Sequence, residues 1–144
     1  MELTHVTLVV HDLDRALDFY VGTLGFEKRA DISNQGFRWL TVAQPGHGLE
    51  IVLLKGVRET AKHTGVSERW ILGTDDCRRD FAALRSRGVK FEETEPQDGY
   101  FGVNATFADP DGNRFMLRQM AKDQLMSGRV VQGVIVPKTD AAHR

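Results

Sequence analysis

The sequence predicts an α+β domain in which one βαβββ pattern occurs twice. Two observations carry this prediction: the order of apolar runs recurs after 64 residues, and turns that contain Gly, Asn and Pro separate the runs. The recurrence maps Asp12, Leu17 and Tyr20 onto Asp76, Phe81 and Leu84. Neither half can bury its own sheet alone, so we expect tandem modules, 3–54 and 67–119, to pack into one domain over 1–120. Residues 121–144 would form a C-terminal extension.

In the first module each element has its own signal. Segment 3–10 alternates core-type residues such as Leu8 with more polar ones and predicts a strand. Asp12 or Asp14 can cap the helix that follows, and Gly25 can end it. Three further strands are expected at roughly 26–30, 37–42 and 49–54. Segment 55–66 is interpreted as a loop.

The second module repeats this order. A strand is expected at 68–74, and Asp75 or Asp76 can cap a helix that ends at Gly88. Cys77 falls on the apolar side of that helix and is interpreted as an inert core residue. The remaining strands are expected at 89–93, 103–108 and 113–119, the last two joined by a turn at 109–112. Beyond them we expect a short helix at 121–126 and an extra strand at 129–136.

Composition excludes several classes of protein. A chain of 144 residues with 41% hydrophobic content fits one domain, and a net charge of −1 argues against nucleic-acid or membrane partners. We expect a cytoplasmic protein, since no leader or membrane-spanning segment is evident and a single cysteine precludes an internal disulfide. The motifs of serine hydrolases, nucleotide-binding loops and dinucleotide-binding folds are lacking.

Four stretches resemble one known superfamily. They are His5 in the first strand, the helix start at 12–20, Leu-Gly-Phe at 24–26 and Phe-Ala-Asp-Pro-Asp-Gly-Asn at 107–113. Together they resemble the vicinal oxygen chelate superfamily, which includes glyoxalases, bleomycin-resistance proteins and extradiol dioxygenases. The resemblance implies two modules that form a curved, cup-like mixed sheet with helices on the convex side. It also implies a small-molecule ligand and a homodimer.

The resemblance further implies where a metal would lie in relatives that use one. Ligands would come from the first and fourth strands of each module, which here hold His5 and Glu50, then Arg69 and Met116. The repeat points to the same places, since His5 recurs as Arg69 and Met116 lies on the last strand as Glu50 does on the fourth. Arginine has no lone pair and a thioether suits soft ions, so we predict no bound divalent metal and no cofactor. If a metal were bound, His5 and Glu50 would be its ligands.

Two roles remain open for Arg69 at this stage. It could pair with Glu50 and offer its free N–H groups to a ligand oxygen in place of a metal, or the two could form a structural ion pair beside an ordinary His5. Further ligand-binding residues are expected on one strand face and in a loop near the cup. They are Phe37, Trp39, Thr41, Tyr100 and Phe101, with Met116. The remaining histidines, among them His63, are interpreted as exposed.

The sequence thus predicts a glyoxalase/bleomycin-resistance-like small-molecule-binding protein with a degenerate, metal-free site. The alternative is an enzyme of the same superfamily, a lyase, isomerase or dioxygenase. That enzyme would be metal-dependent or would use His5, Glu50 and Arg69 as catalytic residues without metal.

Overall fold

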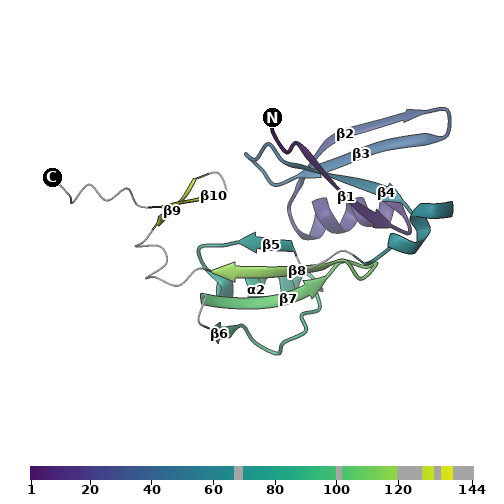
Figure 1. Ribbon diagram of the computed structural model, residues 1–144. Coiled ribbons are helices and arrows are strands. Elements are labelled where there is room, and N and C mark those ends of the chain that lie inside the picture. Colours follow the sequence, from purple (N-terminus) through teal and green to yellow (C-terminus); the bar gives the residue numbers. More distant parts are fainter. Residues whose placement is uncertain (67–69, 100–101, 120–127, 132–133, 138–144) are drawn as a thin grey trace.

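The computed structural model describes residues 1–66, 70–99, 102–119, 128–131 and 134–137. Figure 1 shows two modules in succession, each with a four-stranded sheet and its helices, followed by a small hairpin. The predicted α+β class with two tandem modules is confirmed.

The first module follows the predicted order. It consists of β1 (His5–Val10), α1 (Leu13–Leu17), the π-helix η1 (Asp18–Thr23), β2 (Glu27–Asn34), β3 (Phe37–Ala43) and β4 (Glu50–Lys55). Asp12 is the N-cap, because its Oδ1 accepts a hydrogen bond from the Arg15 backbone N–H at 2.7 Å. Gly25 ends the helix with φ of 79°, a left-handed conformation that glycine adopts without strain. The segment predicted as a loop contains the 3₁₀ helix η2 (Arg58–His63).

The second module departs from expectation at one strand. It consists of β5 (Trp70–Gly73), α2 (Cys77–Ser86), β6 (Gln97–Gly99), β7 (Gly102–Ala108) and β8 (Arg114–Gln119). The strand predicted at 89–93 is wrong, since only an isolated bridge from Phe91 to Phe107 forms there. The Phe91 ring lies 4.2 Å from that of Phe81 and 5.5 Å from that of Phe107. The apolar pattern of this segment therefore reflects core packing, while β6 is polar and exposed.

Both sheets share one topology and one register. Their strand orders are β1-β4-β3-β2 and β5-β8-β7-β6, with the first pair of each parallel and the remaining pairs antiparallel. Val6 lies opposite Ile51 as Trp70 lies opposite Phe115. Carried along the strands, this match pairs Glu50 with Arg114, whereas Met116 corresponds to Val52. Met116 was predicted to be the counterpart of Glu50. It instead lies two residues beyond the actual counterpart, Arg114, on the same face of the strand.

One hydrophobic core spans both modules. The α1–η1 segment contributes Ala16 and Tyr20, and α2 contributes Cys77 and Phe81. The sheets contribute Leu8, Val10, Leu40, Val42, Ile51, Leu53, Ala105, Phe107, Phe115 and Leu117. Cys77 is fully buried as predicted, and burial raises the pKa of its thiol to about 11, which keeps it protonated and unreactive at neutral pH.

A buried polar junction ties the modules together. The Tyr20 hydroxyl donates to Asp109 Oδ2 at 2.7 Å, across 89 residues of sequence. Asp109 also accepts from the backbone N–H groups of Asp111 and Asn113 and from Asn113 Nδ2. Burial, and then the Asp109 charge, raises the pKa of Tyr20 far above its usual value, so the hydroxyl keeps its proton. The Asp-Pro-Asp-Gly-Asn turn is therefore a structural clasp.

The C-terminal extension forms an antiparallel hairpin of β9 (Gly128–Val131) and β10 (Val134–Pro137). The stretch expected to hold one extra strand, 129–136, contains parts of both of these strands. The helix predicted at 121–126 lies outside the described residues.

In the part of the chain that the structure describes, no helix combines the length and the apolar character that a membrane crossing requires.

Candidate functional site

The side of the first sheet opposite α1 carries the residues that sequence reasoning selected. Leu8, Leu40 and Leu53 point into the core, so the alternating residues of the same strands point to the other side. We call this side the open face. From β1, β3 and β4 it receives His5, Thr7, Val9, Phe37, Trp39, Thr41, Ala43, Glu50, Val52 and Leu54.

Glu50 lies at the centre of this face. It pairs with His5 in the sheet, and its Oε1 accepts a hydrogen bond from the fully buried Thr41 hydroxyl at 2.6 Å. Its Oε2 lies 3.6 Å from His5 Nε2, beyond hydrogen-bonding distance. The side chains of His5 and Glu50 are 38% and 25% exposed. One carboxylate oxygen is therefore held by the protein, and the other is accessible beside an imidazole.

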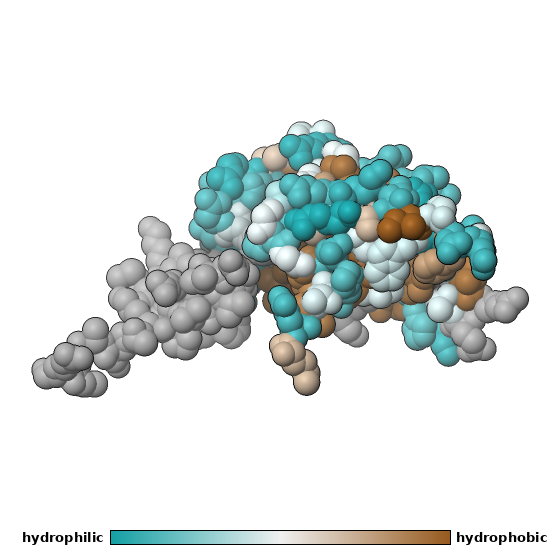
Figure 2. All heavy atoms as spheres, turned by 90° about the horizontal axis from the view of Figure 1, so that it is seen from above, coloured by the Kyte–Doolittle hydropathy of each residue, from teal (hydrophilic) through white to brown (hydrophobic). Residues whose placement is uncertain are grey.

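An apolar shelf adjoins the carboxylate. The Trp39 ring lies 5.7 Å from the His5 ring at an interplanar angle of 53° and is itself partly exposed. Ile32, opposite Trp39 on β2, and Phe37 are more exposed still. Figure 2 shows scattered brown, apolar groups among the largely hydrophilic residues of one side of the molecule. Exposed aromatic area next to an acceptor is typical of small-molecule sites.

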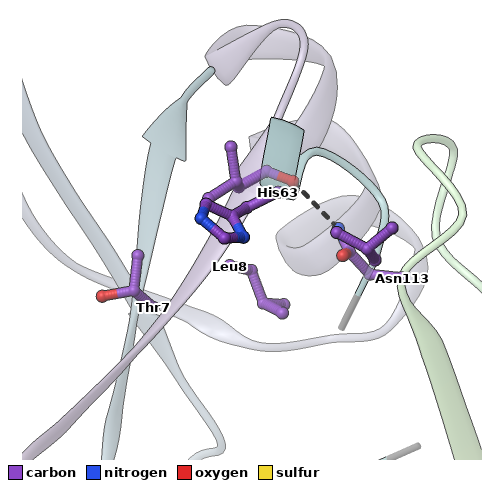
Figure 3. Close-up of a pocket in the computed structure, with 6 residues that line it drawn as sticks. Thr7, Leu8, His63 and Asn113 are labelled. Carbon is purple, nitrogen blue, oxygen red and sulfur yellow. Dashed lines mark hydrogen bonds between the residues drawn. The ribbon is translucent and has the colours of Figure 1, made fainter. Parts of the chain in front are cut away.

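A shallow cavity of about 270 Å³ lies further along β1. It is lined by Thr7, Leu8, Val9, His63, Val66 and Asn113. Figure 3 shows the His63 ring beside β1 and the hydrogen bond from Asn113 Nδ2 to the Val9 carbonyl, which measures 3.2 Å. Because Thr7 and Val9 belong to the open face, this cavity adjoins that face at the junction between the modules.

The structure brings together some of the predicted residues and leaves others apart. His5, Trp39, Thr41 and Glu50 form one cluster, with Phe37 further out on the same strand. Met116 lies on β8, opposite Ile71 and in the other sheet. Arg69, Tyr100 and Phe101 lie outside the described residues.

The cluster can be tested against the metal chemistry of the superfamily. His5 and Glu50 supply two suitable donors, whereas catalytic zinc sites commonly take three protein ligands. Among the described residues, no group of three His, Cys, Asp or Glu side chains is placed to hold an ion. The open face, as described, does not fit a divalent metal site.

Two features of the site were not anticipated. Thr41 was expected to line the ligand site, but its side chain is fully buried, and its hydroxyl donates to Glu50 Oε1. Ile32 was missed because β2 was predicted to end at 30. The Asn34-Gln35-Gly36 turn could have revealed it: Gln35 and Gly36 both have positive φ, as a tight two-residue hairpin requires, and that register places Ile32 opposite Trp39.

A two-module fold with an aromatic shelf and a carboxylate on one sheet face defines a class of small-molecule-binding domains and enzymes. The model of the Glyoxalase/Bleomycin resistance protein/Dioxygenase superfamily matches residues 2–117. The chain belongs to this superfamily.

Similar proteins include both binding proteins and enzymes. An uncharacterized protein of Shewanella frigidimarina is 33% identical over 85% of this chain and 96% of its own. TnmS3, an antibiotic binding protein from Streptomyces sp. CB03234, is 35% identical in sequence to this chain. Its crystal structure matches 84% of this chain and 97% of its own, with a TM-score of 0.75. A probable chloroplastic lactoylglutathione lyase of Arabidopsis thaliana is 33% identical over 76% of this chain and 33% of its own.

Proposed function

We propose that this protein binds and sequesters a small organic molecule at the open face without transforming it. The observation that carries the proposal is the arrangement of Trp39, His5 and Glu50, in which an exposed indole lies beside a carboxylate with one accessible oxygen. Such a site offers stacking area and one directional contact, which are the usual elements of ligand pockets. The similarity to an antibiotic-binding protein supports the same reading.

We also propose that sequestration needs no metal. The described open face offers the His5 and Glu50 donors alone, and Met116 offers only a thioether sulfur. Metal analysis of protein purified without chelator is expected to find far less than one equivalent of any first-row metal. A stoichiometric metal would contradict this part of the proposal.

A second copy of the chain would complete the site. Ile32 and Phe37 are 62% and 53% exposed on the same side as Trp39, and neighbouring exposed apolar side chains commonly mark a contact surface. Light scattering is expected to give about twice the chain mass of 16.2 kDa. Ile32→Glu should shift the protein toward monomer, whereas a monomeric wild type would contradict the homodimer. We place this dimer in the cytoplasm, where the lone Cys77 stays reduced.

Calorimetry with a panel of antibiotics tests the main proposal. Bleomycin, doxorubicin and erythromycin are titrated into the protein with and without EDTA, and each ligand is recovered for mass spectrometry. We expect micromolar or tighter binding of at least one compound, insensitive to EDTA, with the ligand recovered unchanged. Trp39→Ala should weaken binding at least about tenfold, while Val57→Ala, an exposed apolar residue outside the open face, should not. Failure of the whole panel would contradict sequestration of antibiotic-like molecules.

One observation favours a second function. His5 Nε2 and Glu50 Oε2 lie 3.6 Å apart, so an imidazole and a carboxylate could act together on a proton of a bound substrate. The similarity to a probable lactoylglutathione lyase gives a specific reaction to test. Turnover of the hemithioacetal of glutathione and methylglyoxal, assayed with and without added Zn²⁺ or Ni²⁺ and abolished by Glu50→Gln, would establish the enzyme and replace the binding function.

A further inference from the structure

The open face has an unusual charge pattern. Of the ten residues that β1, β3 and β4 place there, Glu50 alone carries a carboxylate, and none is Lys or Arg. On the outer strand β2, Glu27 lies opposite Ala43 at the edge of this face, and its carboxylate is paired with Arg29 at 3.2 Å. The other residues are His5, two threonines and apolar side chains. A single carboxylate on a mostly apolar surface attracts cations more strongly than it would among other surface charges, because fewer counter-charges and less water screen it.

The two oxygens of this carboxylate differ. Oε1 is occupied by the hydrogen bond from Thr41, which fixes the rotation of the carboxylate. Oε2 has His5 Nε2 as a neighbour at 3.6 Å, too far for a hydrogen bond. A ligand group that donates a hydrogen bond to Oε2 would satisfy it, and a positively charged donor would form the stronger bond. An anionic ligand would face repulsion at the same place.

The aromatic part of the site points to the shape of the ligand. Trp39 is 37% exposed, and its ring stands beside the His5 ring rather than flat against it, with an angle of 53° between the planes. One indole face can therefore receive a flat ring, and an indole is the aromatic group that attracts a nearby cation most strongly. Phe37 and Ile32 extend the apolar surface outward along the hairpin.

From these observations we infer that the site selects planar aromatic molecules that carry a protonated amine. The ring lies on Trp39 and the ammonium or amidinium group donates to Glu50 Oε2. This inference rests on the proposed binding function and adds the chemical class of its ligand.

Two acridines of matched shape test the inference by calorimetry. 9-Aminoacridine is a cation at neutral pH, and acridine-9-carboxylate carries a carboxylate on the same ring system. We expect the wild type to bind the cation at least about tenfold more tightly than the anion. Glu50→Gln keeps the shape of the side chain and should remove this preference. Glu95→Gln removes the same charge from an exposed position elsewhere and should keep it.

Each outcome bears on the inference separately from the proposed function. Equal binding of the two acridines, tighter binding of the anion, or a preference that survives in Glu50→Gln would overturn the ligand class, while the antibiotic panel would still decide sequestration. If neither acridine binds but a panel compound does, the ligand class is equally wrong. The comparison within the wild type needs no variant, so it holds even if Glu50→Gln fails to fold.

Discussion

The two sheets have the same topology and register but very different exposed faces. Leu40 lies opposite Leu53 as Ala105 lies opposite Leu117, so Trp39 corresponds to Asn104 and Thr41 to Thr106. In the same way Glu50 corresponds to Arg114. The first module thus has an indole and a carboxylate where the second has an amide and a guanidinium that is paired with Glu92 at 2.8 Å.

The core positions of the two modules have not diverged in this way. Ile51 and Leu53 correspond to Phe115 and Leu117, and all four are buried. Core positions must stay apolar for the sheet to pack, whereas the opposite face is free to carry different chemistry. The comparison teaches that the repeat accounts for the fold, and that the residues of the proposed binding site belong to one copy.

The largest expected effect concerns the structural clasp at Asp109. Its hydrogen bond from the first module to the second has no equivalent in the reverse direction. Tyr20 of the first module reaches Asp109 of the second, but the counterpart of Tyr20 is Leu84, which has no hydroxyl. Asp109→Ala should cost about 3–5 kcal/mol of unfolding free energy in urea, because it leaves several buried donors without an acceptor.

Tyr20→Phe serves as the graded control for the clasp. It removes one donor and leaves the carboxylate with its other partners, so it should cost about 1–2 kcal/mol. A loss below about 1 kcal/mol for Asp109→Ala would show that the clasp does not hold the modules together.

The next largest effect is on ligand affinity, and it compares Trp39 with Asn104, its counterpart in the second sheet. Trp39→Ala should weaken ligand binding by about 1.4–3 kcal/mol, or at least about tenfold, because it removes the stacking surface. Asn104→Ala, at the corresponding position of the second sheet, should change affinity less than about threefold. Calorimetry with whichever panel compound binds the wild type measures both. Equal losses would place the ligand between the two faces and remove the asymmetry.

Sequence reasoning succeeded where periodicity and turn chemistry act locally. The alternation of β1 and the helix end at Gly25 follow from short-range rules, and both are confirmed. Each N-cap was narrowed to two nearby aspartates, of which the structure selects Asp12 and Asp76. The prediction of a strand at 89–93 failed because Phe91 packs against the rings of Phe81 and Phe107. Contacts between residues so far apart in the sequence cannot be inferred from a local pattern.

The features of the site that could be predicted were likewise those that depend on local sequence. Alternation placed Glu50 and Trp39 on one face, but the bond from Thr41 to Glu50 depends on how β3 and β4 are aligned, and that alignment is set by tertiary structure. The 64-residue repeat already maps Glu50 onto Arg114, and the strand register agrees with it. Met116 was chosen for its place on the last strand and not by that offset, which is why the prediction missed the counterpart of Glu50.

A smaller effect separates the two buried threonines. Thr41→Val removes the donor that fixes the carboxylate, so affinity for 9-aminoacridine should fall severalfold, or about 1 kcal/mol. Thr106→Val makes the same change at the corresponding buried position of the second sheet and should leave affinity unaltered. Restoration of binding by Thr41→Ser would show that the hydroxyl is the relevant group. Equal losses in both valine variants would indicate a general packing effect.

The smallest effect concerns the outer strands. The long β2–β3 hairpin is fixed by Arg38, which reaches Asp31 at 2.8 Å and Asp14 of α1's first turn at 2.7 Å. The hydrogen bond from Arg38 holds the pKa of Asp31 at about 2, below its usual 3.8. A depressed pKa means that the pairing stabilises the folded protein above about pH 4 and that this contribution is lost as the pH falls toward 2.

Arg38→Met should therefore lower the unfolding temperature slightly at pH 6, and the difference from wild type should shrink between pH 4 and pH 2. Arg15→Met, which removes an exposed arginine from α1 itself, should show no comparable pH dependence over that interval. Scanning calorimetry across the acid range measures both. Since β6, the outer strand of the second sheet, is only three residues long, the first sheet alone has an extended outer strand to fix. A constant difference down to pH 2 would mean that the Arg38–Asp31 pair does not stabilise the hairpin that carries Ile32 and Phe37.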